Sequence, residues 1–126
     1  MNRFCADAAR DRQLLFVDAI RAHRERDSPF LTVEVEPDEL GPRWLQFADG
    51  VVNLDCTDEE LDRLKALLDS FPAFKIDELT RPEDAEGTNA RVTAFADQKR
   101  IAEFIDRALG TVYDLPADYR AWVTAV

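Results

Sequence analysis

The stretch RWLQFADGVVNLD, residues 43–55, constrains the fold more than any other part of the chain. Asp49 and Gly50 form a two-residue turn of the kind whose residues adopt positive φ. This turn places four apolar residues opposite one another on one face of a β-hairpin, as the pairs Phe47–Val52 and Leu45–Leu54. Polar Gln46 and Asn53 fall together on the other face. Turn chemistry and apolar alternation therefore predict the same register, with the apolar face in the core.

The rest of the chain alternates between helical and extended patterns. Apolar residues at helical spacing predict helices over residues 8–26, 57–71 and 97–112. Thr57 and Glu60 form a capping box at the start of the second of these helices. Alternating or short apolar runs predict strands over residues 30–36, 73–79 and 90–96.

This order, αβββαββα, predicts an α+β fold. The strands have one apolar and one polar face, so we expect a mostly antiparallel sheet with helices on one side only. A length of 126 residues suits a single domain, residues 1–126. The polar stretch 80–89 is expected to be a solvated loop between two strands, and the sequence assigns it no role.

The C-terminal stretch VYDLPADYRAW, residues 112–122, holds three of the four Tyr and Trp side chains. The last long helix should end near Tyr113 or Asp114, because the residue before Pro116 avoids helical geometry. Beyond it, four residues share one face of a predicted short C-terminal helix: Tyr119, Trp122, Val123 and Val126. So short a helix is unstable alone, so we expect Tyr119 and Trp122 to be largely buried.

This segment is also the candidate interaction surface of the chain. It consists of Tyr113, Tyr119, Arg120 and Trp122. The aromatic face can dock on its own domain, on a second subunit or on a ligand, and the sequence leaves all three open. If Trp122 packs in a core, replacing it with alanine should cost about 3–5 kcal/mol.

The charge of the chain is strongly acidic. There are 26 Asp and Glu residues against 16 Lys and Arg, which gives a net charge of −10. A surface of this kind suits a salt-rich cytoplasm, where self-repulsion is screened. Direct binding to nucleic acid or to an anionic membrane is disfavoured, because both require basic patches. With no apolar run near the roughly 20 residues of a membrane span, we expect a cytoplasmic protein.

No residue pattern predicts catalysis, a cofactor or a metal site. His23 is the only histidine, it falls on an apolar helical stripe, and no nucleophile can be placed beside it. Cys5 and Cys56 are far apart and read as free thiols rather than metal ligands. Glu34 and Glu36 share the polar face of a strand, where solvation explains them. We therefore expect no catalytic, cofactor-binding or metal-binding residues.

Four stretches make the chain resemble a small family of acidic haloarchaeal proteins without a characterised activity. They are LLFVDAIRAHRERDSPFLTVEVEPDE, WLQFADGVVNLDCTDEELDRLKALL, RPEDAEGTN and VYDLPADYRAW. This resemblance implies a lineage and no function. The order αβββαββα is separately similar to the type III secretion chaperone-like fold, whose members are typically homodimers that bind other proteins.

These observations favour a non-enzymatic protein-interaction or regulatory module, chaperone-like, whose partner is another protein or a second copy of itself. One alternative is an acidic regulator that contacts a basic nucleic-acid-binding protein. A second alternative is a small-ligand binder or enzyme that uses the sheet face or the C-terminal aromatic residues.

Overall fold

The predicted hairpin lies near the centre of a seven-stranded sheet. The structure, a computed structural model, describes residues 5–26, 30–38, 41–81, 83 and 87–125. The strands follow the order β1-β7-β2-β3-β4-β6-β5 in the sheet, and every neighbouring pair is antiparallel. Their bounds are β1 Cys5–Ala6, β2 Leu31–Asp38, β3 Gly41–Ala48, β4 Val51–Cys56, β5 Phe74–Thr80, β6 Thr88–Ala94 and β7 Ala121–Ala125.

The register of the hairpin is the predicted one. Phe47 pairs with Val52 and Leu45 with Leu54, and the four side chains are buried. Asp49 and Gly50 have φ values of 51° and 74°, which identify the positive-φ turn. Two features favour glycine at position 50. Its φ is positive, and a Cβ there would lie 2.5 Å from the ring of Phe95.

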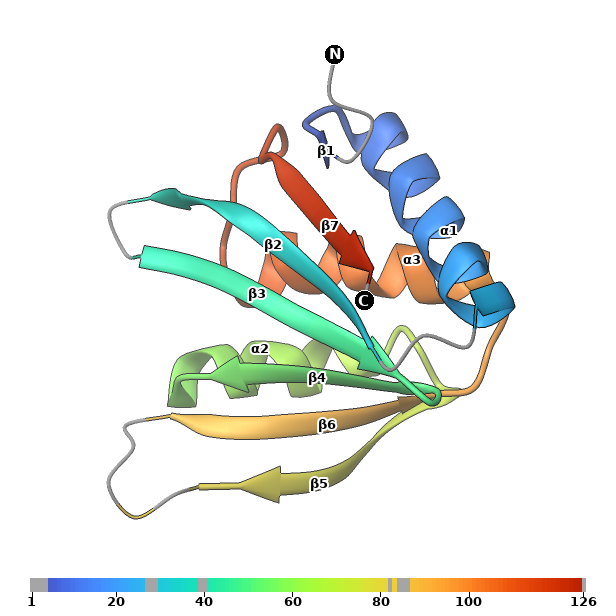
Figure 1. The fold of residues 1–126 in the computed structure, drawn as a ribbon. Helices are drawn as coiled ribbons and strands as arrows, with labels where there is room; N and C mark the ends of the chain where they lie inside the picture. The colour runs from blue at the N-terminus through green and yellow to red at the C-terminus, as the bar shows by residue number, and fades with distance from the viewer. Residues whose placement is uncertain (1–4, 27–29, 39–40, 82, 84–86, 126) are drawn as a thin grey trace.

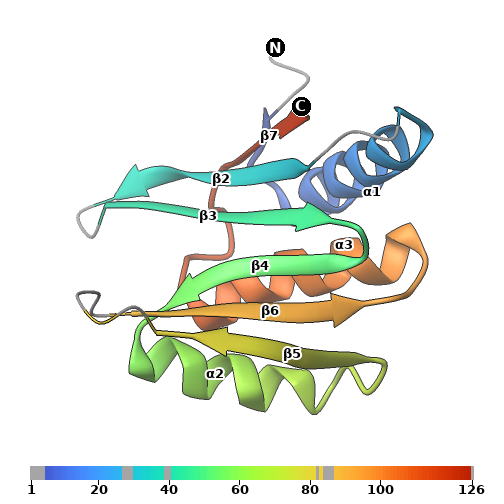
Figure 2. The same cartoon turned by 60° about the horizontal axis from the view of Figure 1, so that its bottom comes forward.

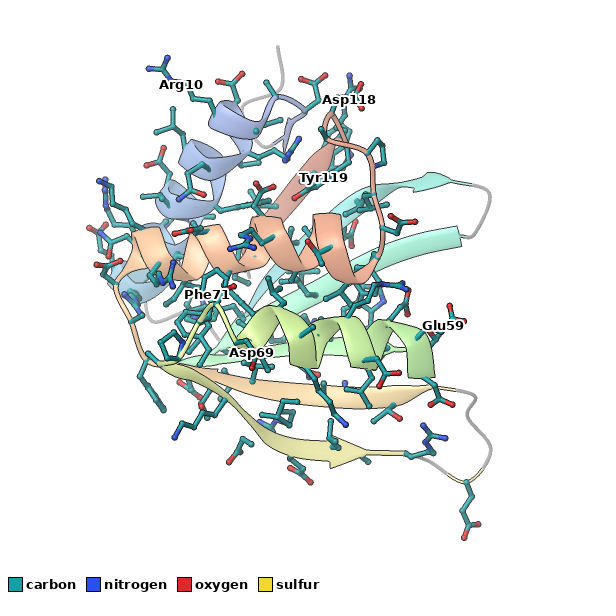
Figure 3. The ribbon with its side chains drawn as sticks, turned by 180° about the vertical axis from the view of Figure 1, so that it is seen from behind. Arg10, Glu59, Asp69, Phe71, Asp118 and Tyr119 are labelled. Carbon is teal, nitrogen blue, oxygen red and sulfur yellow. The ribbon has the colours of Figure 1, made fainter. Side chains whose placement is uncertain are left out.

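Among the described residues, three helices cover one face of the sheet and none covers the other, which we call the open face. They are α1 Ala9–Arg26, α2 Asp58–Leu68 and α3 Gln98–Arg107, and α3 continues into a π-helical turn, η1 Ala108–Val112. The helices lie behind the sheet in Figure 1 and in front of it in the reverse view of Figure 3, and Figure 2 shows the strands between β2 and β5 from a second angle. The predicted α+β fold with helices on one side is confirmed.

Local signals fix where the helices begin. Thr57 and Glu60 form the predicted capping box of α2, in which each side chain accepts from the other residue's backbone N–H. Asp97 caps α3 by accepting from the backbone N–H of Arg100 at 2.9 Å. The starts of α2 and α3 are therefore set by their own sequence, and the core forms where the helices pack on the sheet. Its largest fully buried side chains include Phe16, Phe47, Phe71, Phe104, Ile20, Leu64 and Ile105.

The prediction of a short C-terminal helix is wrong. Residues 121–125 form β7, which lies between β1 and β2 and pairs Val123 with Val33 and Trp122 with Cys5. The physical reason is that the open edge of β2 offers unpaired backbone groups that an extended segment can satisfy. Val126, the fourth residue of the predicted helical face, lies outside the described residues, as do residues 27–29, where the sequence ends the first helix.

Candidate functional site

Both tryptophans of the chain lie on the open face of the sheet. Glu34 of β2 pairs with Trp122 of β7 on one side and with Trp44 of β3 on the other, so the three residues form one row across the sheet. The neighbours of Glu34 in β2, Val33 and Val35, are buried, whereas Glu34 itself is exposed. Because strand side chains alternate between faces, the row Trp122–Glu34–Trp44 points away from the helices.

Two acids on this part of the open face, Glu34 and Asp55, are described by the structure. Within the part of the chain that the structure describes, no Lys, Arg or His forms an ion pair with Glu34 or Asp55. The Asp55 carboxylate instead accepts a hydrogen bond from the Asn89 side chain at 2.9 Å. This end of the face therefore combines aromatic rings with carboxylates whose charge is not neutralised.

The middle and far end of the open face differ in character. The middle row is polar, and its side chains interact with one another. The Gln46 side chain donates a hydrogen bond to Thr32, and Arg91 forms an ion pair with Glu78 at 3.7 Å. The far end is apolar, with Phe95 73% exposed over the Asp49–Gly50 turn. A singly exposed residue such as Phe95 is normal on a protein surface, so it does not by itself mark a binding site.

A cavity of about 230 Å³ lies at the end of the open face that carries Trp44 and Asp55, which we call the acidic end. Trp44 and Asp55 belong both to the face and to the cavity. The remaining wall comes from the last residue of β4, the start of α2, the residue before β6 and the residue after η1. Those other described lining residues are Cys56, Thr57, Glu60, Gly87 and Tyr113. The Tyr113 hydroxyl donates to the backbone carbonyl of Asp55 at 2.6 Å, which fixes the end of β4 against η1.

Cys56 in the cavity wall is not a nucleophile. Burial, and then the nearby carboxylates of Glu60 and Asp55, raise the pKa of its thiol from 9.0 to about 12. The thiol is therefore protonated at neutral pH, when a reactive cysteine would need to be a thiolate. The side chain of Cys5 lies outside what the structure describes.

The structure does not gather the four candidate residues of the C-terminal segment into one surface. Tyr113 lines the cavity, Tyr119 is buried between helices, and Trp122 is half-buried on the open face. Arg120 is exposed and pairs with Asp7 at 3.3 Å. Tyr113 and Trp122 therefore lie at the open face or its cavity, and Tyr119 does not. The predicted burial of Tyr119 is confirmed, whereas Trp122 is only half-buried.

Tyr119 attaches the C-terminal segment to the helices (Figure 3). Its hydroxyl donates to Asp106 of α3 at 2.6 Å, and the Arg12 guanidinium of α1 lies 3.8 Å from the centre of its ring. Arg12 is itself buried and donates to Asp106 at 2.8 Å and to the Tyr119 carbonyl at 3.0 Å. Burial, with the hydrogen bond to Asp106 second, raises the pKa of Tyr119. This cluster is structural, because its polar groups are engaged with one another.

The remaining chemical candidates are structural as well. His23 is buried, and its ring packs edge-on against Phe47 with centroids 5.6 Å apart. Among the described residues, no group of three or more potential metal ligands lies together. In the same part of the chain, no helix is long and apolar enough to cross a membrane.

Comparison with known proteins gives a family and no activity. Residues 1–126 match the group described as "Family of unknown function (DUF7975)". The chain belongs to this family. No curated protein and no solved structure matches it. A role therefore has to be argued from the open face itself.

Proposed function

We propose that this member of the family is a protein-interaction module, rather than an enzyme, and that its open sheet face binds a protein partner with a cationic surface. The observation that carries the proposal is the row Trp122–Glu34–Trp44 on the face that no described helix covers. Tryptophan is enriched at the energetic centres of protein interfaces, because its large rigid ring is buried at little entropic cost.

Charge complementarity selects the kind of partner. The chain carries a net charge of −10, and Glu34 and Asp55 add unneutralised carboxylates beside the two indole rings. Indole rings and carboxylates both attract Arg and Lys side chains. A second copy of the chain would bring the same surplus of acid against itself, so a basic protein fits this face better than a homodimer does.

The alternative role is an acidic regulator of a basic nucleic-acid-binding protein, and this chemistry makes that role more specific. Such a partner presents Lys and Arg patches to its nucleic acid, and the open face would compete for those patches. A location in a salt-rich cytoplasm is part of the proposal, since the acidic composition suits it.

Affinity capture from native lysate in molar KCl tests the proposal. Three baits are compared: the wild type, the double variant Trp44→Ala/Trp122→Ala, and Asp69→Asn as a control. Asp69 is exposed at the end of α2, on the helical side of the molecule (Figure 3). We expect one defined protein with a basic surface to be retained by the wild type and the control and lost from the double variant. Retention of the same proteins by all three baits, or capture of only a second copy of the chain, would contradict the proposal.

A further inference from the structure

The cavity at the acidic end of the open face is too small for most small-molecule ligands. Its volume is about 230 Å³, whereas pockets for drug-sized molecules and cofactors occupy about 300–1,000 Å³. It is continuous with the open face, because Trp44 and Asp55 line both. A single side chain of a partner docked on that face is an occupant of suitable size.

Carboxylates from two elements form part of the cavity wall. Asp55 and Glu60 contribute carboxylates to its wall, and its described lining contains no Lys, Arg or His. Both carboxylates add to the effect of burial in raising the pKa of the Cys56 thiol, and the nearby cation of Arg63 acts in the opposite direction. Glu60 is held in place because its Oε1 accepts from the backbone N–H of Thr57 at 2.8 Å.

The wall chemistry distinguishes arginine from lysine. The indole of Trp44, 38% exposed, offers a flat aromatic surface, and Asp55 is exposed beside the cavity. A guanidinium group is planar, stacks on aromatic rings and pairs with carboxylates through two parallel hydrogen bonds. An ammonium group is compact and more strongly hydrated, so it gains less from the indole surface.

We infer that the cavity receives the guanidinium group of an arginine side chain from the protein partner, which stacks on Trp44 and pairs with Asp55. This inference rests on the proposed function and names the anchor that the partner must carry. The two groups that hold the guanidinium, Trp44 and Asp55, belong both to the open face and to the cavity wall.

The fluorescence of Trp44 tests this directly. Trp44 and Trp122 are the only tryptophans, so the variant Trp122→Phe reports on the cavity alone. N-acetyl-arginine amide is titrated into this variant at constant KCl, beside N-acetyl-lysine amide and N-acetyl-citrulline amide. Citrulline has the shape of arginine without its charge. We expect saturable quenching by arginine, weaker binding of lysine, and none by citrulline. Equal responses to arginine and citrulline, or no saturation with arginine, would overturn the inference.

Two further variants locate the bound cation, with folding checked by thermal melts. Asp55→Asn keeps an oxygen that can accept from Asn89 and should weaken arginine binding about tenfold, as expected for a lost charged hydrogen bond. Asp69→Asn removes the same charge from the helical side and should leave it unchanged. In Trp44→Phe, which retains Trp122, the fluorescence should not respond. Equal weakening by both charge variants, or quenching of Trp122 alone, would place the cation elsewhere.

Failure here is separable from failure of the proposed function. If a basic partner binds the wild type and is lost from Trp44→Ala/Trp122→Ala, while Trp44 shows no response to arginine, the open face is an interface and the arginine anchor is wrong. If arginine amide binds at Trp44 but no protein requires the two tryptophans, the cavity is a cation site and the interaction proposal is wrong.

Discussion

Tyr119 is the residue on which the attachment of the C-terminal segment depends. It joins three parts of the chain, because its hydroxyl reaches Asp106 in α3 and its ring lies under Arg12 of α1. The two charged groups are nearly enclosed, with side-chain exposures of 4% for Arg12 and 22% for Asp106. Charges in such surroundings are costly unless they are hydrogen-bonded, so Tyr119 stabilises the pair as well as the segment.

Replacing Tyr119 with phenylalanine should lower the free energy of unfolding by about 1–3 kcal/mol, because the variant loses a hydrogen bond to a carboxylate. Arg120→Ala, one residue away, removes an exposed ion pair with Asp7 and should cost less than about 1 kcal/mol. Urea unfolding of both variants measures the difference. Equal losses in the two variants would show that the Tyr119 cluster does not hold the segment.

The raised pKa of Cys56 predicts a loss of stability in alkaline solution. Between pH 9 and about pH 12 the unfolded thiol releases its proton while the buried thiol keeps it. The folded state therefore binds more protons than the unfolded state in this range. Its free energy of unfolding falls as the pH rises, by up to about 1.4 kcal/mol per pH unit. Thermal melts at increasing pH should show a steeper decline for the wild type than for Cys56→Ala. Parallel declines would mean that Cys56 is not buried as described. Tyr119, whose pKa is also raised, contributes equally to both.

At the scale of elements, local signals predicted what local interactions determine. The hairpin register followed from the Asp49–Gly50 turn, and the start of α2 from Thr57 and Glu60, because each depends on neighbours within a few residues. The alternation around Leu45 also assigns Trp44 to the polar face, and this was the signal for the open face. One tryptophan alone does not define a surface, and the second one in the same row, Trp122, is expected in a helix from its spacing.

β7 could not be predicted because its structure depends on distant partners. The spacing of Tyr119, Trp122 and Val123 fits one helical face, but Trp122 and Val123 fit opposite faces of a strand equally well, and short segments do not distinguish the two. The edge of β2 decides the outcome, by offering a complete ladder from Leu31 to Val35. β1 has two residues and carries no pattern at all. The cavity likewise joins residues from β3, β4 and α2 with the residues next to β6 and η1, and no local spacing shows that these lie close together.

The placement of Trp122 in β7 changes the expected effect of its removal. As a half-buried residue of the open face, Trp122→Ala should cost only about 1–2 kcal/mol, rather than the cost of a packed core site. Chemical denaturation measures this cost, and partner capture with the same variant should fail. A loss of 3 kcal/mol or more, on the scale of core truncations of about 3–5 kcal/mol, would show that Trp122 is a core residue and would remove it from the interaction face.

At the scale of the whole molecule, charge governs the conditions in which the fold is stable. A net charge of −10 over 126 residues produces repulsion that the folded state must overcome. Raising KCl from about 0.1 M to above about 1 M shortens the Debye length from about 10 Å to about 3 Å or less, which screens that repulsion. The melting temperature should therefore rise over this range. A melting temperature that stays constant or falls would contradict the interpretation of the acidic surface as an adaptation to salt.

The layered architecture gives the molecule two faces with different roles. The helices and the Tyr119 cluster close one side, while Trp44, Glu34 and Trp122 stand on the other. An amide NMR titration with hexa-arginine amide, a cationic peptide, compares the two faces in a single measurement. The predicted shifts concentrate on β7, β2, β3 and the end of β4, and the amides of α1 and α3 remain unchanged. Shifts spread over α1 and α3, or absent from the row Trp122–Glu34–Trp44, would contradict the assignment of the open face as the interaction surface.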